Sequence, residues 1–186
     1  MAKKIRKDRI TQVSRQGEIN IPIGHYALIK SNNNPHSYVK KLAIFGLGSC
    51  IALLLYDRKK MISAMSHILL AEVKKTKIAN PKQYPHKYAT LSVKDLFNEM
   101  LNHGALKKNI KAVIVGGAEI FKRGPLELGK ENILAVKHQL KLFDIQIEKE
   151  IVGGTKGRVF IYDFTDNSIS IKITGEAEFK KFILKE

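Results

Sequence analysis

Three largely apolar runs that follow one another between residues 42 and 70 constrain the fold of this chain more than any other feature. They are separated only by the turn signals GLGS and DRKK, and they read LAIF (42–45), IALLLY (51–56) and MISAMSHILL (61–70). Each run is too short to span a bilayer. Short turns between short apolar runs favour neighbouring strands over helices. The pattern therefore predicts three consecutive buried strands, without membrane insertion.

The rest of the chain reads as a mixture of helices and strands. Helical periodicity predicts one amphipathic helix from 88 to 103, ended by Gly104, and another near 130–143. The first should bury Val93, Leu96, Phe97, Met100 and Leu101, and the second Ile133, Val136, Leu140 and Phe143. Further strands are expected at KAVIV (111–115), IQIEKEIV (145–152), RVFIY (158–162) and SISIKI (168–173), the last two joined by a turn through Asp166 and Asn167. Loops are expected at 31–37 and 71–87, and the whole pattern predicts an α/β fold.

Length and cysteine content set the domain organisation and the compartment. A chain of 186 residues fits one domain, and a composition of 44% hydrophobic and 27% charged residues is typical of a globular protein. Residues 1–18 read as a basic, flexible extension, which leaves 19–186 as a single domain. That basic start reaches no apolar segment of the kind a secretory signal has. One cysteine forms no internal disulfide, so we expect a cytoplasmic protein.

The net charge of +16 suggests an anionic partner. Nucleic acid is disfavoured, because the basic residues are spread along the chain and no helix-turn-helix, zinc-finger or aromatic RNA-binding signature is present. Two explanations stay open. The charge either keeps the protein soluble or attracts an acidic protein partner.

Several cofactor and metal motifs can be tested and set aside. GLGSCI begins like a dinucleotide-binding GxGxxG, but Ile51 occupies the third glycine position and a strand follows where a helix is needed. GGAEIF and IVGGTKGR lack the spacing of a phosphate-binding P-loop. The six histidines show no close pair at metal-ligand spacing. Neither a cofactor nor a metal is predicted.

Cys50 and His67 are the residues that remain. Cys50 follows the GLGS turn, and His67 interrupts an apolar run in which an imidazole needs a hydrogen bond. If both lie on neighbouring antiparallel strands, their side chains can face each other near one end of the sheet. The alternative is a buried cysteine that packs as a small hydrophobe and a histidine satisfied in the core.

The chain resembles the CheD family, the chemoreceptor glutamine deamidases of bacterial chemotaxis. GHYALIK resembles an early strand of that family, LAIFGLGSCIALLLYD its TLGLGSC signature, SAMSHILL its histidine strand and KYATLSVKDLFNEML its first helix. VIVGGAEIF, ELGKENI and IVGGTKGRVF follow in the order that the family has. The resemblance runs from about Gly24 to Ile173.

The resemblance implies a site and a mechanism. Cys50 would be the nucleophile that attacks a glutamine carboxamide, and His67 its base. Ile44 stands where the family has a catalytic threonine, so only its backbone carbonyl could orient the histidine. Main-chain N–H groups at Gly48, Ser49 and Cys50 would stabilise the oxyanion, and Gly46 and Gly48 would allow unusual backbone angles.

The resemblance also implies a fold, a substrate and partners. The expected fold is a layered α/β domain with a central β-sandwich of mixed sheets flanked by helices. The substrate would be glutamines on the cytoplasmic helices of chemoreceptors. A second implied partner is a CheC-type phosphatase, so a rival hypothesis is a binding module with weak or no catalysis. Lysines near the site entrance would favour an acidic receptor, and they are Lys74, Lys75, Lys77, Lys82 and Lys87.

Overall fold

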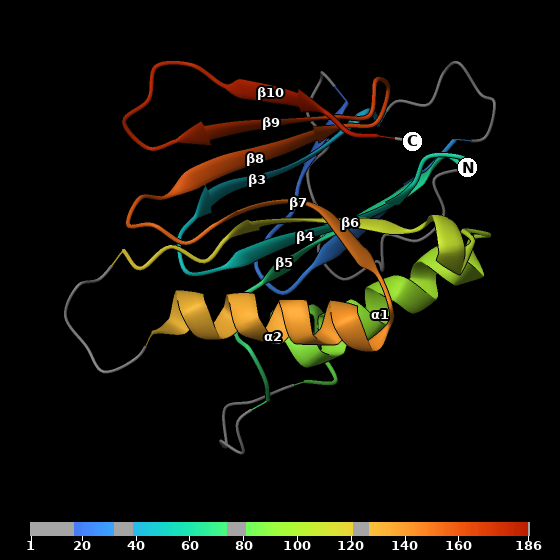
Figure 1. Cartoon of the computed structure of the whole chain (residues 1–186), viewed down its shortest axis with the longest axis horizontal. Helices are drawn as coiled ribbons and strands as arrows, with labels where there is room; N and C mark the ends of the chain where they lie inside the picture. The colour runs from blue at the N-terminus through green and yellow to red at the C-terminus, as the bar shows by residue number, and fades with distance from the viewer. Residues whose placement is uncertain (1–16, 32–38, 74–80, 121–126, 186) are drawn as a thin grey trace.

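Two five-stranded sheets and two helices form three stacked layers in the computed structural model, which describes residues 17–31, 39–73, 81–120 and 127–185. The outer sheet has the order β1-β3-β8-β9-β10 and the inner sheet the order β2-β5-β4-β6-β7. Both sheets mix parallel and antiparallel pairs. Figure 1 shows the inner sheet between the outer sheet and the helices α1 and α2. The predicted layered α/β fold is confirmed, with both helices on one side of the sandwich.

The elements of the described residues have the following bounds. The outer sheet contains β1 (Glu18–Asn20), β3 (Lys41–Leu47), β8 (Arg158–Asp163), β9 (Ser168–Ile173) and β10 (Lys180–Ile183). The inner sheet contains β2 (Tyr26–Lys30), β5 (Ile62–Ile68), β4 (Ile51–Asp57), β6 (Lys111–Gly116) and β7 (Gln146–Val152). The helices are α1 (Ala89–Asn102) and α2 (Leu128–Leu142), and two short 3₁₀ turns lie at Pro85–Lys87 and Lys107–Asn109.

The uninterrupted apolar run of β4 follows from its place in the middle of the inner sheet. Alternate side chains of a strand point to opposite faces. Ala52, Leu54 and Tyr56 pack between the two sheets, whereas Ile51, Leu53 and Leu55 pack against the helices. Because both faces are covered, no position of β4 can be polar except at its end. The three strands predicted between residues 42 and 70 are confirmed as β3, β4 and β5.

Both predicted helices are confirmed. Among the side chains expected on their apolar faces, Leu101 is exposed and Ile133 and Phe143 are only partly buried. Val93, Leu96, Phe97 and Met100 are buried against the inner sheet, but Leu101 is 37% exposed. Leu101 lies in the last turn of α1, one residue before the helix ends at Asn102. Gly104 follows the helix with φ of +100°, which is the left-handed conformation expected of a terminating glycine.

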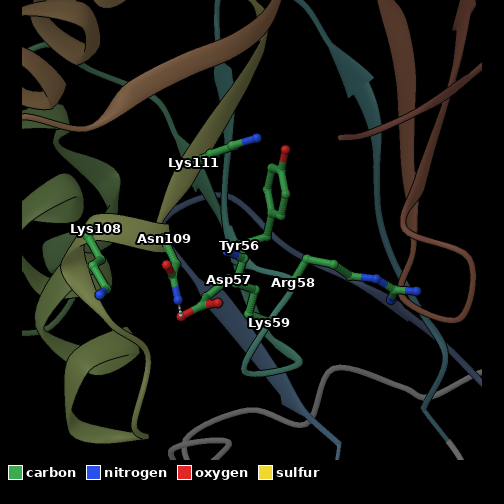
Figure 2. A pocket seen from close by; sticks show the side chains of 7 residues that line it. All are labelled: Tyr56, Asp57, Arg58, Lys59, Lys108, Asn109 and Lys111. Carbon is green, nitrogen blue, oxygen red and sulfur yellow. Dashed lines mark hydrogen bonds between the residues drawn. The ribbon is translucent and has the colours of Figure 1, made fainter. Parts of the chain in front are cut away.

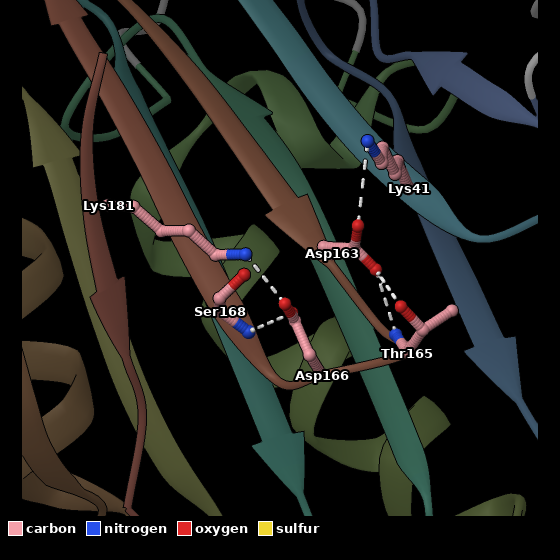
Figure 3. Close-up of polar contacts among 6 residues, drawn as sticks. All are labelled: Lys41, Asp163, Thr165, Asp166, Ser168 and Lys181. Atoms are coloured by element: carbon pink, nitrogen blue, oxygen red, sulfur yellow. Dashed lines mark hydrogen bonds and ion pairs between the residues drawn. The ribbon is translucent and has the colours of Figure 1, made fainter.

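The predicted turn between β8 and β9 is held by two aspartates, as Figure 3 shows. Asp163 accepts hydrogen bonds from the Thr165 main chain and hydroxyl and pairs with Lys41 of β3 at 3.5 Å. Asp166 accepts from the Ser168 N–H and binds Lys181 of β10 at 2.7 Å. The two aspartates therefore link the β8–β9 hairpin by ion pairs to the strands on either side of it, β3 and β10.

Two strands of the outer sheet were not predicted. β1 has three residues and pairs in parallel with β3, and β10 pairs with β9 at the open edge. Ile183 in β10 is 67% exposed and Phe182 beside it packs partly against the core, but four residues are too few for periodicity to reveal the strand. The basic extension expected at 1–18 lies outside the described residues as far as residue 16, so it stays a prediction. No helix among the described residues has the length and apolarity needed to cross a bilayer.

Candidate active site

Cys50 lies in the turn that carries the chain from the outer sheet to the inner sheet. β3 has a register irregularity between Ile44 and Leu47, and Gly46 within it adopts φ of +73°. A Cβ on Gly46 would have no atom within 4 Å, so this glycine is needed for its conformation alone. Gly48 differs from the prediction, because its φ is not positive. What Gly48 provides is space, since a Cβ there would lie 2.6 Å from Ile120 Cδ1.

The main-chain carbonyls of Gly48, Ser49 and Cys50 in this turn each accept a hydrogen bond. The bonds are Ala118 N–H to Gly48 O, Asn132 Nδ2 to Ser49 O and Gly117 N–H to Cys50 O, each at 2.8 Å. In a trans peptide the N–H points opposite to the C=O. The N–H of Ser49 therefore points away from Ala118, and the N–H of Cys50 points away from Asn132.

Gly116 allows the end of β6 to pack closely against the turn that contains Cys50. It adopts φ of +122°, and a Cβ there would lie 2.1 Å from the Cys50 carbonyl oxygen. Only a glycine permits so close an approach of two main chains. The contact with Cys50 thus explains the first glycine of the VIVGGAEIF motif, whereas a Cβ on Gly117 would lie 2.5 Å from the Ile133 side chain of α2.

His67 lies on β5, which runs antiparallel to β4 as predicted. The register pairs His67 with Ala52 and Ile68 with Ile51. His67 therefore points to the same face as Cys50 and is its diagonal neighbour across the strand pair, a position from which long side chains reach one another. The exposed fractions of Cys50 and His67 are 8% and 5%, so both side chains are buried, and Cys50 packs in the core between the sheets.

A main-chain carbonyl fixes the tautomer of His67. Nδ1 lies 3.0 Å from the carbonyl oxygen of Ile21. Because that oxygen can only accept, Nδ1 carries the hydrogen and the Nε2 of the neutral ring has a free lone pair. Nε2 is buried and has no hydrogen-bond partner among the described residues. The ring is thus prepared to take a proton at Nε2.

The carbonyl expected at Ile44 is replaced by that of Ile21. Ile44 is fully buried between the sheets, and neither ring nitrogen of His67 is bonded to it in the described part of the chain. The reason lies in the path of the chain after β1. Ile21 N–H still bonds to Ala43 of the outer sheet at 2.9 Å, and Gly24 N–H bonds to the His67 carbonyl of the inner sheet at 2.8 Å. Between these two bonds the chain crosses from one sheet to the other beside His67.

Burial keeps both groups uncharged near neutral pH. It raises the pKa of the Cys50 thiol, an effect that the main-chain N–H of Cys50 opposes. Burial also lowers the pKa of His67, while the hydrogen bond to Ile21 raises it and the neighbouring His25 lowers it further. His67 Nε2 makes no hydrogen bond to the Cys50 thiol in this structure. A neutral thiol can react with a neutral imidazole as base once the two are within hydrogen-bond distance and the ring takes the thiol proton as the sulfur attacks. The arrangement therefore favours general-base activation over a preformed ion pair.

Asn132 of α2 is a site residue that the sequence interpretation missed. Its side chain is 1% exposed, and Nδ2 donates both to Ser49 O at 2.8 Å and to Leu69 O at 2.9 Å. Asn132 belongs to the ELGKENI motif, whose match to the family was the available signal. A single asparagine in an amphipathic helix gives no other indication that it reaches a distant turn.

A hollow at the opposite end of β4 does not belong to this site. Figure 2 shows its lining, formed by Tyr56, Asp57, Arg58, Lys59, Lys108, Asn109 and Lys111. Asp57 is occupied by hydrogen bonds from the Leu106 main chain and Asn109, and the basic side chains point in different directions. No group of three histidine, cysteine or acidic side chains in the described ranges is placed to hold a metal ion.

The basic segment near the site entrance is only partly described. Lys74, Lys75 and Lys77 lie outside the described residues. Lys82 is exposed, and the main-chain carbonyl of Lys87 accepts hydrogen bonds from Leu69 and Leu70, directly after β5. Positive charge is therefore present close to the end of the strand that carries His67.

Comparison with known proteins gives consistent matches. The family described as "CheD chemotactic sensory transduction" matches residues 69–173. A protein of Clostridium botulinum strain Eklund 17B, named "Probable chemoreceptor glutamine deamidase CheD", is 38% identical over 163 residues, which cover 85% of this chain and 94% of that protein. Proteins with the same name from C. botulinum strain Alaska E43 and Clostridium novyi are 41% and 38% identical over 140 residues, covering 73% of this chain and 84% and 85% of theirs. The family match begins after Cys50 and His67, but a match over 85% of the chain includes both.

Proposed function

The chain belongs to the CheD family, and from this premise we propose that it is a chemoreceptor glutamine deamidase in which Cys50 is the nucleophile and His67 the base. The reaction would hydrolyse a glutamine side-chain amide to glutamate and ammonia. No cofactor enters it. Because the relatives are named for action on chemoreceptors, the proposed partner is the cytoplasmic helical region of such a receptor, and the proposed compartment is the cytoplasm.

The first half-reaction forms a thioester. His67 Nε2 takes the proton of the Cys50 thiol while the sulfur attacks the carboxamide carbon of the substrate. The carbonyl oxygen becomes an oxyanion, which the N–H groups of Ser49 and Cys50 would stabilise. The protonated imidazole then gives its proton to the departing nitrogen, and ammonia leaves. Ile21 keeps the ring in one tautomer throughout, since its carbonyl holds Nδ1–H.

The second half-reaction restores the enzyme. A water molecule takes the place of ammonia, and His67 Nε2 removes its proton as the oxygen attacks the thioester. Collapse of the second tetrahedral intermediate breaks the carbon–sulfur bond, returns the proton to Cys50 and leaves a glutamate side chain. Each turnover replaces a neutral amide on the receptor by a negative charge.

The observation that carries this proposal is the state of the His67 ring. In a histidine with only a structural role, each buried ring nitrogen would be expected to have a hydrogen-bond partner. Here one nitrogen is fixed by a carbonyl, and the other is buried without a partner in the described part of the chain, on the face that carries Cys50. That arrangement supports a general base and is costly for a structural residue.

A binding module that associates with a CheC-type phosphatase remains the rival proposal. One observation favours it: His67 Nε2 makes no hydrogen bond to the Cys50 thiol, and burial both raises the pKa of Cys50 and lowers the pKa of His67. In this alternative, the turn around Cys50 would serve as a docking surface with weak or no catalysis.

One experiment distinguishes the two proposals. The purified protein is incubated with a chemoreceptor cytoplasmic fragment, and glutamine-to-glutamate conversion is mapped by peptide mass spectrometry. Conversion at defined receptor glutamines, growing with time and enzyme concentration, supports the deamidase. A fragment that stays fully amidated while it binds the protein would refute it, and binding to a CheC-type phosphatase under the same conditions would support the module.

A further inference from the structure

Asn132 joins the two strands of the site at the point where their pairing ends. The last pair of β4 and β5 at this end is Ile51 with Ile68, so Leu69 would stand opposite Cys50 one step further. Instead of a hydrogen bond between the two main chains, the Asn132 amide bridges the Ser49 and Leu69 carbonyls from α2.

The bond to Ser49 fixes one particular peptide group. The carbonyl of Ser49 and the N–H of Cys50 belong to the same planar unit, so holding the first sets the direction of the second. That N–H is a donor of the proposed oxyanion site, and it also lowers the pKa of the Cys50 thiol. The bond to Leu69 acts on the other strand, two residues after His67. Asn132 therefore contacts the segments that carry the nucleophile and the base.

The fold brings α2 unusually close in order to make this contact. A Cβ on Gly129 would lie 2.5 Å from the Gly117 carbonyl oxygen. The first turn of α2 can therefore pack against Gly117 only because residue 129 is a glycine. Glu119 accepts a hydrogen bond from the Lys130 N–H at 3.0 Å and fixes the same end of the helix. Asn132 follows within the next turn and faces the sheet.

Packing alone does not account for an amide at this position. The Oδ1 atom of Asn132 is buried and has no hydrogen-bond partner in the described part of the chain. Burying an unpaired acceptor is unfavourable, and an apolar side chain would avoid it. The two donors toward Ser49 and Leu69 are what an apolar residue could not supply.

We propose that Asn132 is a positioning residue for catalysis, which holds the Cys50 peptide and the end of the His67 strand in register so that the thiol, its N–H and the imidazole stay aligned. This inference rests on the proposed function, since it concerns the same cysteine and histidine. Asn132 touches no substrate and acts only through the two main-chain carbonyls.

The test compares two isosteric variants that each lose one amide donor. Asn132→Asp removes the donor to Ser49 and Leu69. Asn167→Asp is the matched control, because Asn167 is also buried and its Nδ2 donates to the Leu184 carbonyl at 3.2 Å, in the outer sheet away from the site. Asn132→Ser, a neutral variant able to bond only one of the two carbonyls, is measured beside them in case Asn132→Asp does not fold.

Two readouts separate positioning from stability. The first is deamidation per folded molecule, where Asn132→Asp should lower kcat by about tenfold or more with KM unchanged, as expected when reacting groups are misaligned. The second is the pH dependence of Cys50 alkylation by iodoacetamide. The parental protein should show a rising limb below the ordinary thiol range of about 8.5, due to His67 acting as base. Asn132→Asp should lose that limb, and Asn167→Asp should keep it.

The outcomes are distinguishable from those of the proposed function. If Asn132→Asp or Asn132→Ser keeps both the limb and the parental kcat, the positioning role is refuted while the cysteine and histidine assignments stand. If Asn132→Asp and Asn167→Asp lose the limb equally, the effect is one of general stability and the inference is also refuted. A parental protein without the limb would overturn the cysteine–histidine pair itself, and the positioning role with it.

Discussion

Gly116→Ala should lower both stability and deamidation activity far more than Gly46→Ala or Gly48→Ala does. A Cβ at Gly116 would lie 2.1 Å from the Cys50 carbonyl oxygen, whereas ordinary contacts begin at 3.4 Å. One of the two main chains must therefore move by about 1.3 Å. The φ of +122° adds strain of about 1–3 kcal/mol. If the movement breaks the bond from Gly117 N–H to Cys50 O, the carbonyl left unpaired costs about 1–3 kcal/mol more.

Gly46 and Gly48 provide graded controls for this prediction. Gly46→Ala meets no atom within 4 Å, so only the strain of its φ of +73° applies, about 1–2 kcal/mol. Gly48→Ala has no positive φ and meets only the end of the Ile120 side chain, which is 44% exposed and can change rotamer for about 1 kcal/mol or less. The predicted order of destabilisation is Gly116→Ala, then Gly46→Ala, then Gly48→Ala.

The assay is urea denaturation of the three variants, followed by deamidation measured per folded molecule. A displacement of about 1 Å at a reacting group can cost about 100-fold in rate, so Gly116→Ala should lose activity even after correction for unfolding. If Gly116→Ala were as stable and as active as Gly48→Ala, the reasoning that β6 must pack closely against the turn that contains Cys50 would be refuted.

Three further predictions concern His67, Ile44 and the surface charge. Burial lowers the pKa of His67, so the unfolded chain binds a proton at this residue before the folded chain does as the pH falls below 6.5. The contribution of His67 to the free energy of unfolding is therefore fully present above pH 6.5 and is lost as the pH falls through the pKa of the folded state. His67→Phe should flatten the pH dependence of the free energy of unfolding over that range, and an unchanged slope would contradict this prediction. Ile44→Thr should raise kcat by no more than about threefold, since the Ile21 carbonyl already orients His67, and a larger gain would show that the missing hydroxyl is needed. Apparent deamidation efficiency should fall as salt is raised from about 0.1 M to 1 M, where the screening length shortens from about 10 Å to 3 Å. Replacing Lys74, Lys75 and Lys77 by glutamine should mimic that fall without changing the alkylation of Cys50, and efficiency indifferent to both would leave the segment as ordinary surface.

The sequence was sufficient to predict the strands and helices whose buried faces produce a regular pattern of apolar residues. β4 is apolar at every position up to its end because sheet and helices cover both its faces, and α1 and α2 each present one apolar stripe. β10 could not be predicted in the same way, because it has only four residues and Phe182 is the one among them that packs partly against the core. A pattern of apolar residues therefore indicates which faces of a strand are buried by neighbouring layers, and a strand with little buried surface gives no such pattern.

Candidate site residues could be proposed from the sequence where the chemistry depends on side chains, but not where it depends on the main chain. Cys50 and His67 were identifiable because a thiol after a glycine turn and an imidazole in an apolar strand are unusual. The carbonyl that orients His67 belongs to Ile21, and any residue type could have supplied it. Asn132 reaches the site through the packing of α2 against Gly117, a tertiary contact that sequence spacing does not encode.

The most direct test of the account is the deamidation rate of Cys50→Ala against a receptor cytoplasmic fragment. Ser49→Ala is the matched control, because it changes the neighbouring side chain and keeps the carbonyl that Asn132 holds. We expect Cys50→Ala to fold normally and to produce no glutamate above the enzyme-free background, while Ser49→Ala converts the same glutamines as the parental protein. Glutamate formation by Cys50→Ala at the parental rate would contradict the assignment of Cys50 as the nucleophile.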